Sequence, residues 1–184
     1  RLIGDKGKVI MLRYNEGSAS TTARENGFLD AIKKHPGVQV VVDNQYAGAT
    51  AESAQAKSEN ILAPLKNPDG SLTIDGIFCC NESSTFGMLR TLEDTKLAGK
   101  VKFVGFDAST KLVAALSNGE INALIVQDPF NMGYIAVKLM SQTLKHQPVE
   151  KKIDTGATLV TRANMSDPKI NALLHPPLAQ YLKD

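Results

Sequence analysis

The segment 101–107, Val-Lys-Phe-Val-Gly-Phe-Asp, constrains the fold more than any other because an apolar run ends directly in a carboxylate. The same pattern recurs twice: Asn81 follows Ile-Phe-Cys-Cys, and Gln127 follows Ala-Leu-Ile-Val. Near-continuous apolar runs are typical of parallel strands that are covered on both faces. In open α/β sheets, ligands bind outside the carboxyl ends of such strands. We therefore expect Asn81, Asp107 and Gln127 to lie at one edge of a sheet.

Strand and helix signals alternate along the chain with short connections. Five apolar runs predict strands at 8–13, 38–43, 74–80, 101–106 and 122–126. Helical patterns separate them and start near residues 22, 50, 83 and 109, the last ending at Asn118-Gly119. Strands that alternate with helices favour βαβ units with right-handed crossovers. The sequence therefore predicts an α/β fold with a doubly wound parallel sheet.

The first helix carries its own start signal and a candidate buried face. Thr22-Ala-Arg-Glu25 fits a capping box, in which the first and fourth residues satisfy free backbone N–H groups reciprocally. Phe28, Ala31 and Ile32 follow at helical spacing. We expect these three side chains to form a buried stripe against the sheet.

The chain changes character after Gln127. Pro129 suits a helix start, and an apolar stripe of Met132, Ile135, Ala136 and Leu139 predicts an amphipathic helix to about residue 145. Residues 154–160 are predicted to be extended, and Leu173 and Leu174 in the tail are expected to dock on the surface.

Charge and hydrophobicity argue against two classes of protein, those that bind nucleic acid and those that span a membrane. The 21 Lys and Arg are interspersed with 19 Asp and Glu, so the net charge of +2 gives no electrostatic footprint for nucleic acid. No apolar run approaches the roughly 20 residues of a membrane helix. The sequence starts without Met and enters a predicted strand within a few residues, so we expect it to be a piece of a longer polypeptide.

Cys79 and Cys80 are the only cysteines, and they are adjacent. Neighbours in a strand point to opposite faces, so an ordinary disulfide between them is strained. The favoured interpretation is two small apolar residues in a buried strand. A vicinal disulfide and a metal ligand remain as alternatives, although no nearby His supports a metal site.

Four polar residues carry planar or forked hydrogen-bonding groups and lie after predicted strands or, for the first, at a predicted helix start: Arg24, Asn81, Asp107 and Gln127. Asn and Gln donate and accept, Asp accepts, and Arg donates through a fork. Such groups suit a ligand with adjacent hydroxyls, each of which both donates and accepts. The alternative is that these residues only cap the following helices, as Asp107 could do with Ser109 as its rival.

The sequence motifs of common enzyme classes fit this chain less well than a binding site does. The chain has no G-x-S-x-G elbow, no G-x-x-x-x-G-K-[ST] loop and no G-x-G-x-x-G turn. A phosphoryl-accepting Asp107 would require acidic residues after the first strand and a Lys after the fifth, where Tyr14-Asn15-Glu16 and Gln127 stand. The three histidines lie near prolines in expected surface positions. We therefore expect a protein that is not an enzyme and needs no cofactor or metal.

Segments 22–28, 78–87, 104–107 and 126–134 together resemble the ribose-binding-like periplasmic sugar-binding proteins. These are the type I solute receptors of ABC transporters, related to the effector domains of LacI-type repressors. The resemblance extends to about Met165. It implies that the four polar residues just described match the sugar-contacting Arg, Asn, Asp and Gln of the family. For the stacking aromatic of that family, this chain offers Tyr46 or the small residues 47–49.

The resemblance also implies a two-lobed protein of which this chain holds one part. Residues 1–127 correspond to the second lobe, 128–156 to a crossover helix and strand that complete the first lobe, and 157–184 to a return segment and tail. The implied partners are a monosaccharide or related polyol, a membrane permease and the missing N-terminal lobe. The implied location is periplasmic or extracellular, with a lipoprotein anchor left open. The alternative is the effector-binding domain of a LacI-type regulator with a DNA-binding headpiece upstream.

Overall fold

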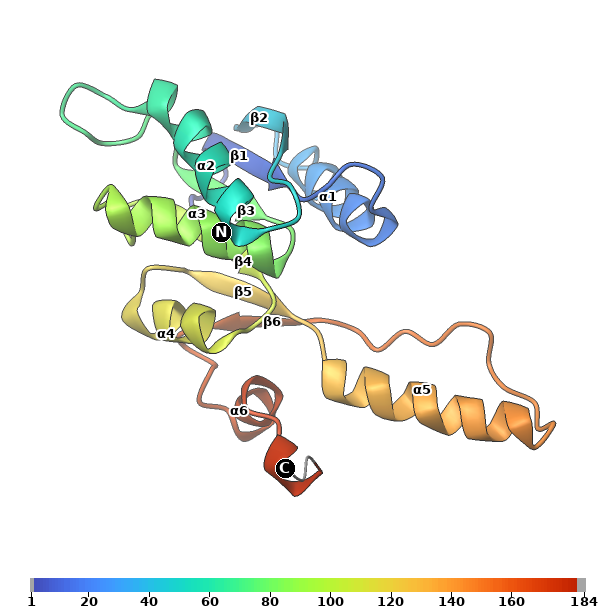
Figure 1. The fold of residues 1–184 in the computed structure, drawn as a ribbon. Coiled ribbons are helices and arrows are strands. Elements are labelled where there is room, and N and C mark those ends of the chain that lie inside the picture. The colour runs from blue at the N-terminus through green and yellow to red at the C-terminus, as the bar shows by residue number, and fades with distance from the viewer. Residues whose placement is uncertain (1, 182–184) are drawn as a thin grey trace.

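The computed structural model describes residues 2–181, which form a six-stranded sheet with helices around it (Figure 1). The strands are β1 (Gly7–Arg13), β2 (Val38–Tyr46), β3 (Gly76–Cys79), β4 (Lys102–Phe106), β5 (Ala123–Val126) and β6 (Thr158–Thr161). Their spatial order is β2-β1-β3-β4-β5-β6. Strands β1 to β5 are parallel, and β6 pairs antiparallel to β5. The predicted α/β fold with a doubly wound sheet is confirmed.

The helices alternate with the strands up to β5. They are α1 (Ala19–Ile32), α2 (Ala51–Leu62), α3 (Glu82–Asp94), α4 (Thr110–Asn118), α5 (Pro129–Leu144) and α6 (Pro168–Leu174), with short 3₁₀ turns at Ala63–Leu65 and Leu178–Gln180. Local signals set two of their ends. The Thr50 hydroxyl accepts from the Ser53 N–H at 3.1 Å in a capping box that starts α2. Gly119 ends α4 in the left-handed conformation with φ 82°.

One face of the sheet packs against α2, α3 and α4 and holds the main core. Ile10 and Leu12 of β1 point to this face, as do Ile77 and Cys79 of β3. They join buried helix residues such as Leu92 in one continuous cluster. Because side chains alternate along a strand, the residues between them point to the opposite face.

The opposite face is covered by α1 alone and holds a much smaller cluster. Its buried members are Met11, Phe78 and Cys80. Phe28 of α1 stacks on Phe78 with ring centroids 4.6 Å apart and planes 9° from parallel. Helix α1 lies over β1 and β2, so it covers only one side of this face.

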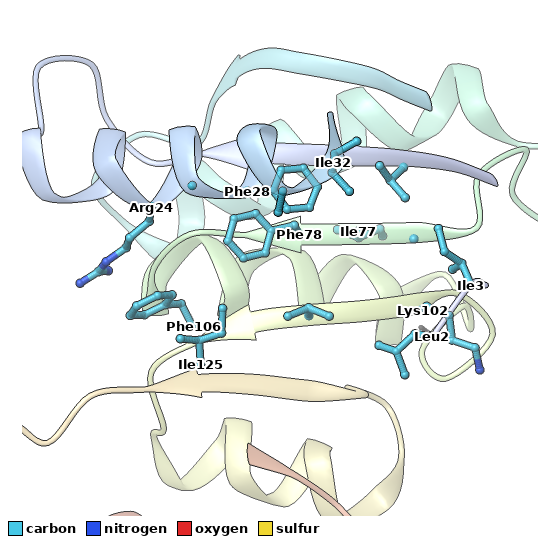
Figure 2. Close-up of a pocket in the computed structure, with 15 residues that line it drawn as sticks. Leu2, Ile3, Arg24, Phe28, Ile32, Ile77, Phe78, Lys102, Phe106 and Ile125 are labelled. Carbon is cyan, nitrogen blue, oxygen red and sulfur yellow. The ribbon is translucent and has the colours of Figure 1, made fainter. Parts of the chain in front are cut away.

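An apolar groove of about 480 Å³ runs beside α1 on this face (Figure 2). Phe28 and Ile32 of α1 form one wall. Val104 and Ile125 line the part over β4 and β5. Arg24 and Phe106 lie at the carboxyl end of the groove, whereas Leu2, Ile3 and Lys102 lie at its amino end. The lining residues are otherwise Val9, Gly27, Ala31, Gly76, Ile77 and Phe78.

Two predictions for α1 are wrong. The helix begins at Ala19, three residues before Thr22, and Ser18 at its N-cap makes no side-chain capping bond. Glu25 lies inside the helix, where it is buried against the sheet. The expected buried stripe is incomplete, since Ala31 is exposed and Ile32 is only half-buried. The stripe does face the sheet side, but it borders the groove rather than a second helix.

Helix α5 extends away from the sheet (Figure 1), and none of its residues is buried. Tyr134, Val137, Met140 and Leu144 are 63–76% exposed. The chain then returns to pair Thr158 of β6 with Val126 of β5. No helix within residues 2–181 combines the length and apolar character that crossing a membrane requires.

The C-terminal segment is anchored in the core, whereas the sequence predicted only contact with the surface. Leu174 of α6 is buried in the main core, and Leu173 packs against that core. The segment is thereby anchored on the side of the sheet that carries α4 and β6.

Candidate functional site

Arg24 and Gln127 meet at the carboxyl edge of the sheet. Arg24 lies in the second turn of α1, and Gln127 directly follows β5. The Arg24 Nη2 donates to Gln127 Oε1 at 2.7 Å, and its Nη1 donates to the Cys80 carbonyl oxygen at 3.0 Å. The guanidinium lies over the Phe106 ring, 3.8 Å from the centroid. These contacts hold the Arg24 fork in one orientation before any ligand arrives.

Asp107 lies beside this pair, directly after β4. Its backbone adopts φ 68°, a left-handed conformation that Asp tolerates better than most residues. The Asp107 N–H donates to the Ile125 carbonyl at 2.9 Å, which fixes the turn. Burial raises the pKa of the Asp107 carboxyl, and the charge of Arg24 opposes that rise. The helix-capping alternative does not describe Asp107, because α4 begins at Thr110 with Ser109 in the N-cap position.

Asn81 occupies the N-cap of α3, and its side chain is engaged there. Its Oδ1 accepts from the Ser84 N–H at 3.3 Å and from the Ser84 hydroxyl at 2.6 Å. Its Nδ2 donates to the Ser83 hydroxyl at 2.9 Å. The helix-capping alternative therefore describes Asn81 in this structure. A ligand could still use the second Nδ2 hydrogen, because an amide carries two donors.

Tyr46 ends β2, at the edge of the sheet, and β1 separates it from β3. Tyr46 is 38% exposed, and the centroid of its ring lies 5.8 Å from the guanidinium carbon of Arg13. Tyr46 is thus associated with the end of β1 rather than with the Arg24–Gln127 pair.

Asp107 and Gln127 line a hollow of about 310 Å³ at the carboxyl edge. Glu82 of α3 also lines it, and residues of the C-terminal segment, including Leu173 and Pro176, close another side. The hollow is therefore more polar than the apolar groove, and it contains acceptors for ligand hydroxyls. Arg24 lies at the boundary between the two, since it also lines the carboxyl end of the groove.

Arg13 and Glu25 form an ion pair behind the edge, a pairing that was not predicted from the sequence. Arg13 Nη1 lies 2.6 Å from Glu25 Oε2, and the Glu25 side chain is 2% exposed. Glu25 Oε1 also accepts from the Tyr14 N–H at 3.3 Å and the Cys80 thiol at 3.4 Å. Arg13 Nε donates to the Asp43 carbonyl. A usable signal existed, because Arg13 is the last residue of an apolar strand, close to the position that Asn81, Asp107 and Gln127 take after theirs.

The two cysteines are buried and free. Burial and the neighbouring Glu25 raise the pKa of the Cys80 thiol to about 12, and burial raises that of Cys79 as well. Both are therefore protonated and unreactive near neutral pH. Within residues 2–181, no three His, Cys, Asp or Glu residues gather in a way that could hold a metal ion.

The arrangement offers hydrogen-bonding groups to a ligand that carries hydroxyls. Arg24 supplies a fixed cationic fork, Gln127 an amide, and Asp107 a carboxylate beside a small hollow. Each hydroxyl of a ligand needs both a donor and an acceptor, and these groups supply both.

Comparison with known proteins gives a consistent family. Residues 1–148 match the model of the periplasmic binding protein domain. The D-allose-binding periplasmic protein of Escherichia coli K12 is 29% identical over 140 residues, which cover 76% of this chain and 43% of that protein. The ribose import binding protein of the same organism is 29% identical over 163 residues, which cover 86% and 51%.

Solved structures agree in both fold and sequence. A carbohydrate transporter solute-binding protein from Agrobacterium radiobacter in complex with D-arabinose is 39% identical, with a TM-score of 0.84. It matches 92% of this chain and 55% of its own length. An ABC transporter solute-binding protein from Agrobacterium vitis with bound D-fucose is 30% identical, with a TM-score of 0.85 over 94% and 57%.

The chain spans about half the length of the curated relatives it matches. The family match covers most of this sequence, and the solved relatives share its sheet and helices. The chain therefore belongs to the periplasmic binding protein domain family, as a lobe of the ribose-binding-like type I fold.

Proposed function

We propose that this chain forms one lobe of the substrate-binding component of a sugar ABC transporter and reversibly binds a monosaccharide or related polyol. The observation that carries the proposal is the Arg24 guanidinium, which is held on Gln127 and Phe106 beside Asp107 at the carboxyl edge. The printed names of its relatives, which include D-allose and ribose binding proteins, support a sugar ligand.

Each site residue has a proposed role. Arg24 donates two hydrogen bonds to adjacent ligand oxygens, and Asp107 accepts from two hydroxyls. Gln127 keeps Arg24 in place and offers its free amide hydrogens to the ligand. Asn81 donates through its second Nδ2 hydrogen, while Tyr46 is the candidate for stacking on an apolar face of the sugar. A charged partner makes each such bond stronger than a neutral one.

The ligand would lie between this lobe and a second one. In this proposal residues 1–127 form the lobe, 128–156 cross over to complete the missing N-terminal lobe, and 157–184 return. Exposed apolar side chains on α5, outside the predicted stripe, support that division, because large ones such as Val137 and Leu144 are unfavourable in water. A permease in the membrane is the further partner, and the location is periplasmic or extracellular.

Transport is proposed rather than gene regulation. The relatives described above are named as periplasmic, import or transporter binding proteins, which favours a receptor over the effector domain of a LacI-type regulator. These relatives are binding proteins, so the proposed receptor leaves its sugar unchanged.

Isothermal calorimetry on the complete two-lobed receptor tests this function with D-allose, D-ribose, D-arabinose and D-fucose. We expect at least one sugar to bind and Asp107→Ala to weaken that binding by about 2–5 kcal/mol, because ligand hydroxyls lose a charged acceptor. Asp30→Asn, on the exposed side of α1, is the matched control and should bind normally. Unchanged affinity in Asp107→Ala, or turnover of the sugar, would contradict the proposal.

A further inference from the structure

The hydroxyl of Thr85 joins the start of α3 to the end of β4. Thr85 lies near the first turn of α3 and is fully buried. Its Oγ1 donates to the Asn81 carbonyl oxygen at 2.7 Å and accepts from the Phe106 N–H at 3.0 Å. One hydroxyl thereby holds both the residue that caps α3 and the residue that directly precedes Asp107.

Phe106 depends on this hydroxyl because its pairing with the neighbouring strand has ended. The pairing of β3 with β4 runs only as far as Phe78 with Val104. The N–H groups of a strand point alternately to its two neighbours, and that of Asp107 bonds to β5. The Phe106 N–H therefore points to the side of β3, where the Thr85 hydroxyl replaces a strand carbonyl. A buried N–H that lost this acceptor would stay unpaired, which is unfavourable.

The methyl group of Thr85 keeps the hydroxyl turned towards both partners. It packs on the backbone of β4 at Gly105, where any side chain would collide with it. Thr is also β-branched, so its side chain has few rotamers. The spacing between α3 and β4 is therefore fixed by contacts of both branches of one side chain.

We propose that Thr85 is a positioning residue, which holds Asn81 and Asp107 at the spacing that a bound sugar requires. The proposal rests on the proposed function, in which both residues bind hydroxyls of one ligand. Such groups must be held to within about 0.5 Å of their productive positions. The effect extends to Arg24, because its guanidinium lies over the ring of Phe106. Thr85 is fully buried, so it acts through the residues that it joins.

Isothermal calorimetry on variants of the complete receptor tests the proposal. The ligand is whichever of D-allose, D-ribose, D-arabinose and D-fucose binds the parent receptor most tightly. Thr85→Val keeps the shape of the side chain but removes the hydroxyl, and we expect it to weaken binding about tenfold or more, because Phe106 loses its acceptor. Thr85→Ser keeps the hydroxyl and should bind within about threefold of the parent.

Thr91→Val is the matched control on the same helix. Thr91 is as buried as Thr85, and its hydroxyl donates to the carbonyl oxygens of Gln55 and Gly87, both at 3.2 Å. It lines neither the hollow at the carboxyl edge nor the apolar groove. Both valine variants should unfold at lower urea concentration than the parent, but Thr91→Val should bind sugar normally.

Amide hydrogen exchange provides a measurement that needs no sugar. In Thr85→Val, exchange at the Phe106 N–H should be about tenfold faster or more, because that group loses its hydrogen bond. The backbone amide resonances of Asn81 and Asp107 should both shift. In Thr91→Val, neither exchange at Phe106 nor these two resonances should change.

Three calorimetric results overturn the proposal. The first is parent affinity in Thr85→Val. The second is an equal loss of affinity in Thr91→Val, which would assign the effect to general stability. The third is Thr85→Ser binding as weakly as Thr85→Val, which would assign it to the methyl group.

Two further cases keep the outcome decisive. Should Thr85→Val fail to fold, Thr85→Ala also lacks the hydroxyl, and parent affinity in that variant overturns the proposal. If none of the four sugars binds the parent receptor, the sugar proposal fails. Exchange at Phe106 then decides the role of Thr85: faster exchange with shifted Asn81 and Asp107 resonances supports it, and an unchanged spectrum refutes it.

Discussion

The two faces of the sheet are built from the same strands but are packed differently. Towards α2, α3 and α4, a single cluster of buried residues runs from β1 to β6 and includes Leu174 of the tail. Towards α1, three buried residues are joined by Phe28 and a few half-buried neighbours. Adjacent residues of one strand therefore belong to different cores: Ile10 lies in the large one and Met11 in the small one.

The difference shows that a fully buried strand residue does not mean that helices cover the whole of that face of the sheet. Met11 and Phe78 are as buried as residues of the main core, because α1 covers them. Val104 alternates in the same way but is half-buried, because no helix of the described chain lies over it. The substitutions below test how far this contrast extends into stability.

The largest contrast is expected between matched truncations on the two faces. Leu92→Ala removes a fully buried side chain of the main core and should lower the free energy of unfolding by about 2–5 kcal/mol, through lost burial and the cavity left behind. Ile32→Ala, on the wall of the groove, should cost less than about 1.5 kcal/mol in the 184-residue chain, because Ile32 already contacts water. Urea denaturation measures both. Equal losses would show that the two faces contribute alike.

An intermediate effect is expected from the ion pair that ties α1 to its face. Glu25→Ala leaves Arg13 and the Tyr14 N–H without their acceptor, and should cost about 1–3 kcal/mol in urea denaturation. Asp30→Ala removes an exposed carboxylate of the same helix that pairs with Lys33, and is the matched control with no measurable loss expected. If Glu25→Ala were as stable as the parent chain, stacking of Phe28 on Phe78 would be the main attachment of α1.

The smallest effect concerns Asp107, at the edge between the two faces. Burial raises its pKa, so the folded chain binds this proton more tightly than the unfolded chain. Protonated Asp107 therefore does not destabilise the fold below the pKa of the unfolded chain, near 3.8. As pH rises through the higher pKa of the folded chain, the carboxyl ionises in a buried position and the folded state loses stability. Asp107→Asn cannot ionise and should remove that loss. Thermal unfolding of both proteins between pH 3 and 7 measures the difference, and parallel curves would mean that water reaches the carboxylate freely.

The strands were predictable from sequence because each is a run of apolar residues bounded by polar ones. β4 and β5 begin one residue later than predicted, and β2 extends to Tyr46 rather than ending at 43. β2 is an edge strand, where polar residues such as Asp43 and Asn44 remain extended because their side chains reach water. The start of α5 at Pro129 was also predictable, since proline is tolerated only at the beginning of a helix.

The errors on α1 have a physical cause. A helical period shows which side of a helix is apolar, but not whether that side meets a full layer or an open groove. Glu25 matched a capping pattern, whereas its burial depends on pairing with Arg13, which belongs to the preceding strand and not to the helix. The placement of Arg24 on Gln127 joins residues 103 positions apart. Only the position of Gln127 after a strand and of Arg24 near a helix start indicated it, and the ligand roles of these residues remain predictions.

The connections of α5 also set where its excursion from the sheet is attached. Val126 and Thr158 are paired neighbours, so the chain leaves β5 and re-enters β6 at adjacent points of one edge. The start of α5 is held beside them, because the Phe130 ring lies 5.2 Å, centroid to centroid, from that of Tyr181 in the C-terminal segment. Gln127, with its bond to Arg24, lies directly at this attachment. Whatever packs on α5 is therefore joined to the sheet next to the candidate site.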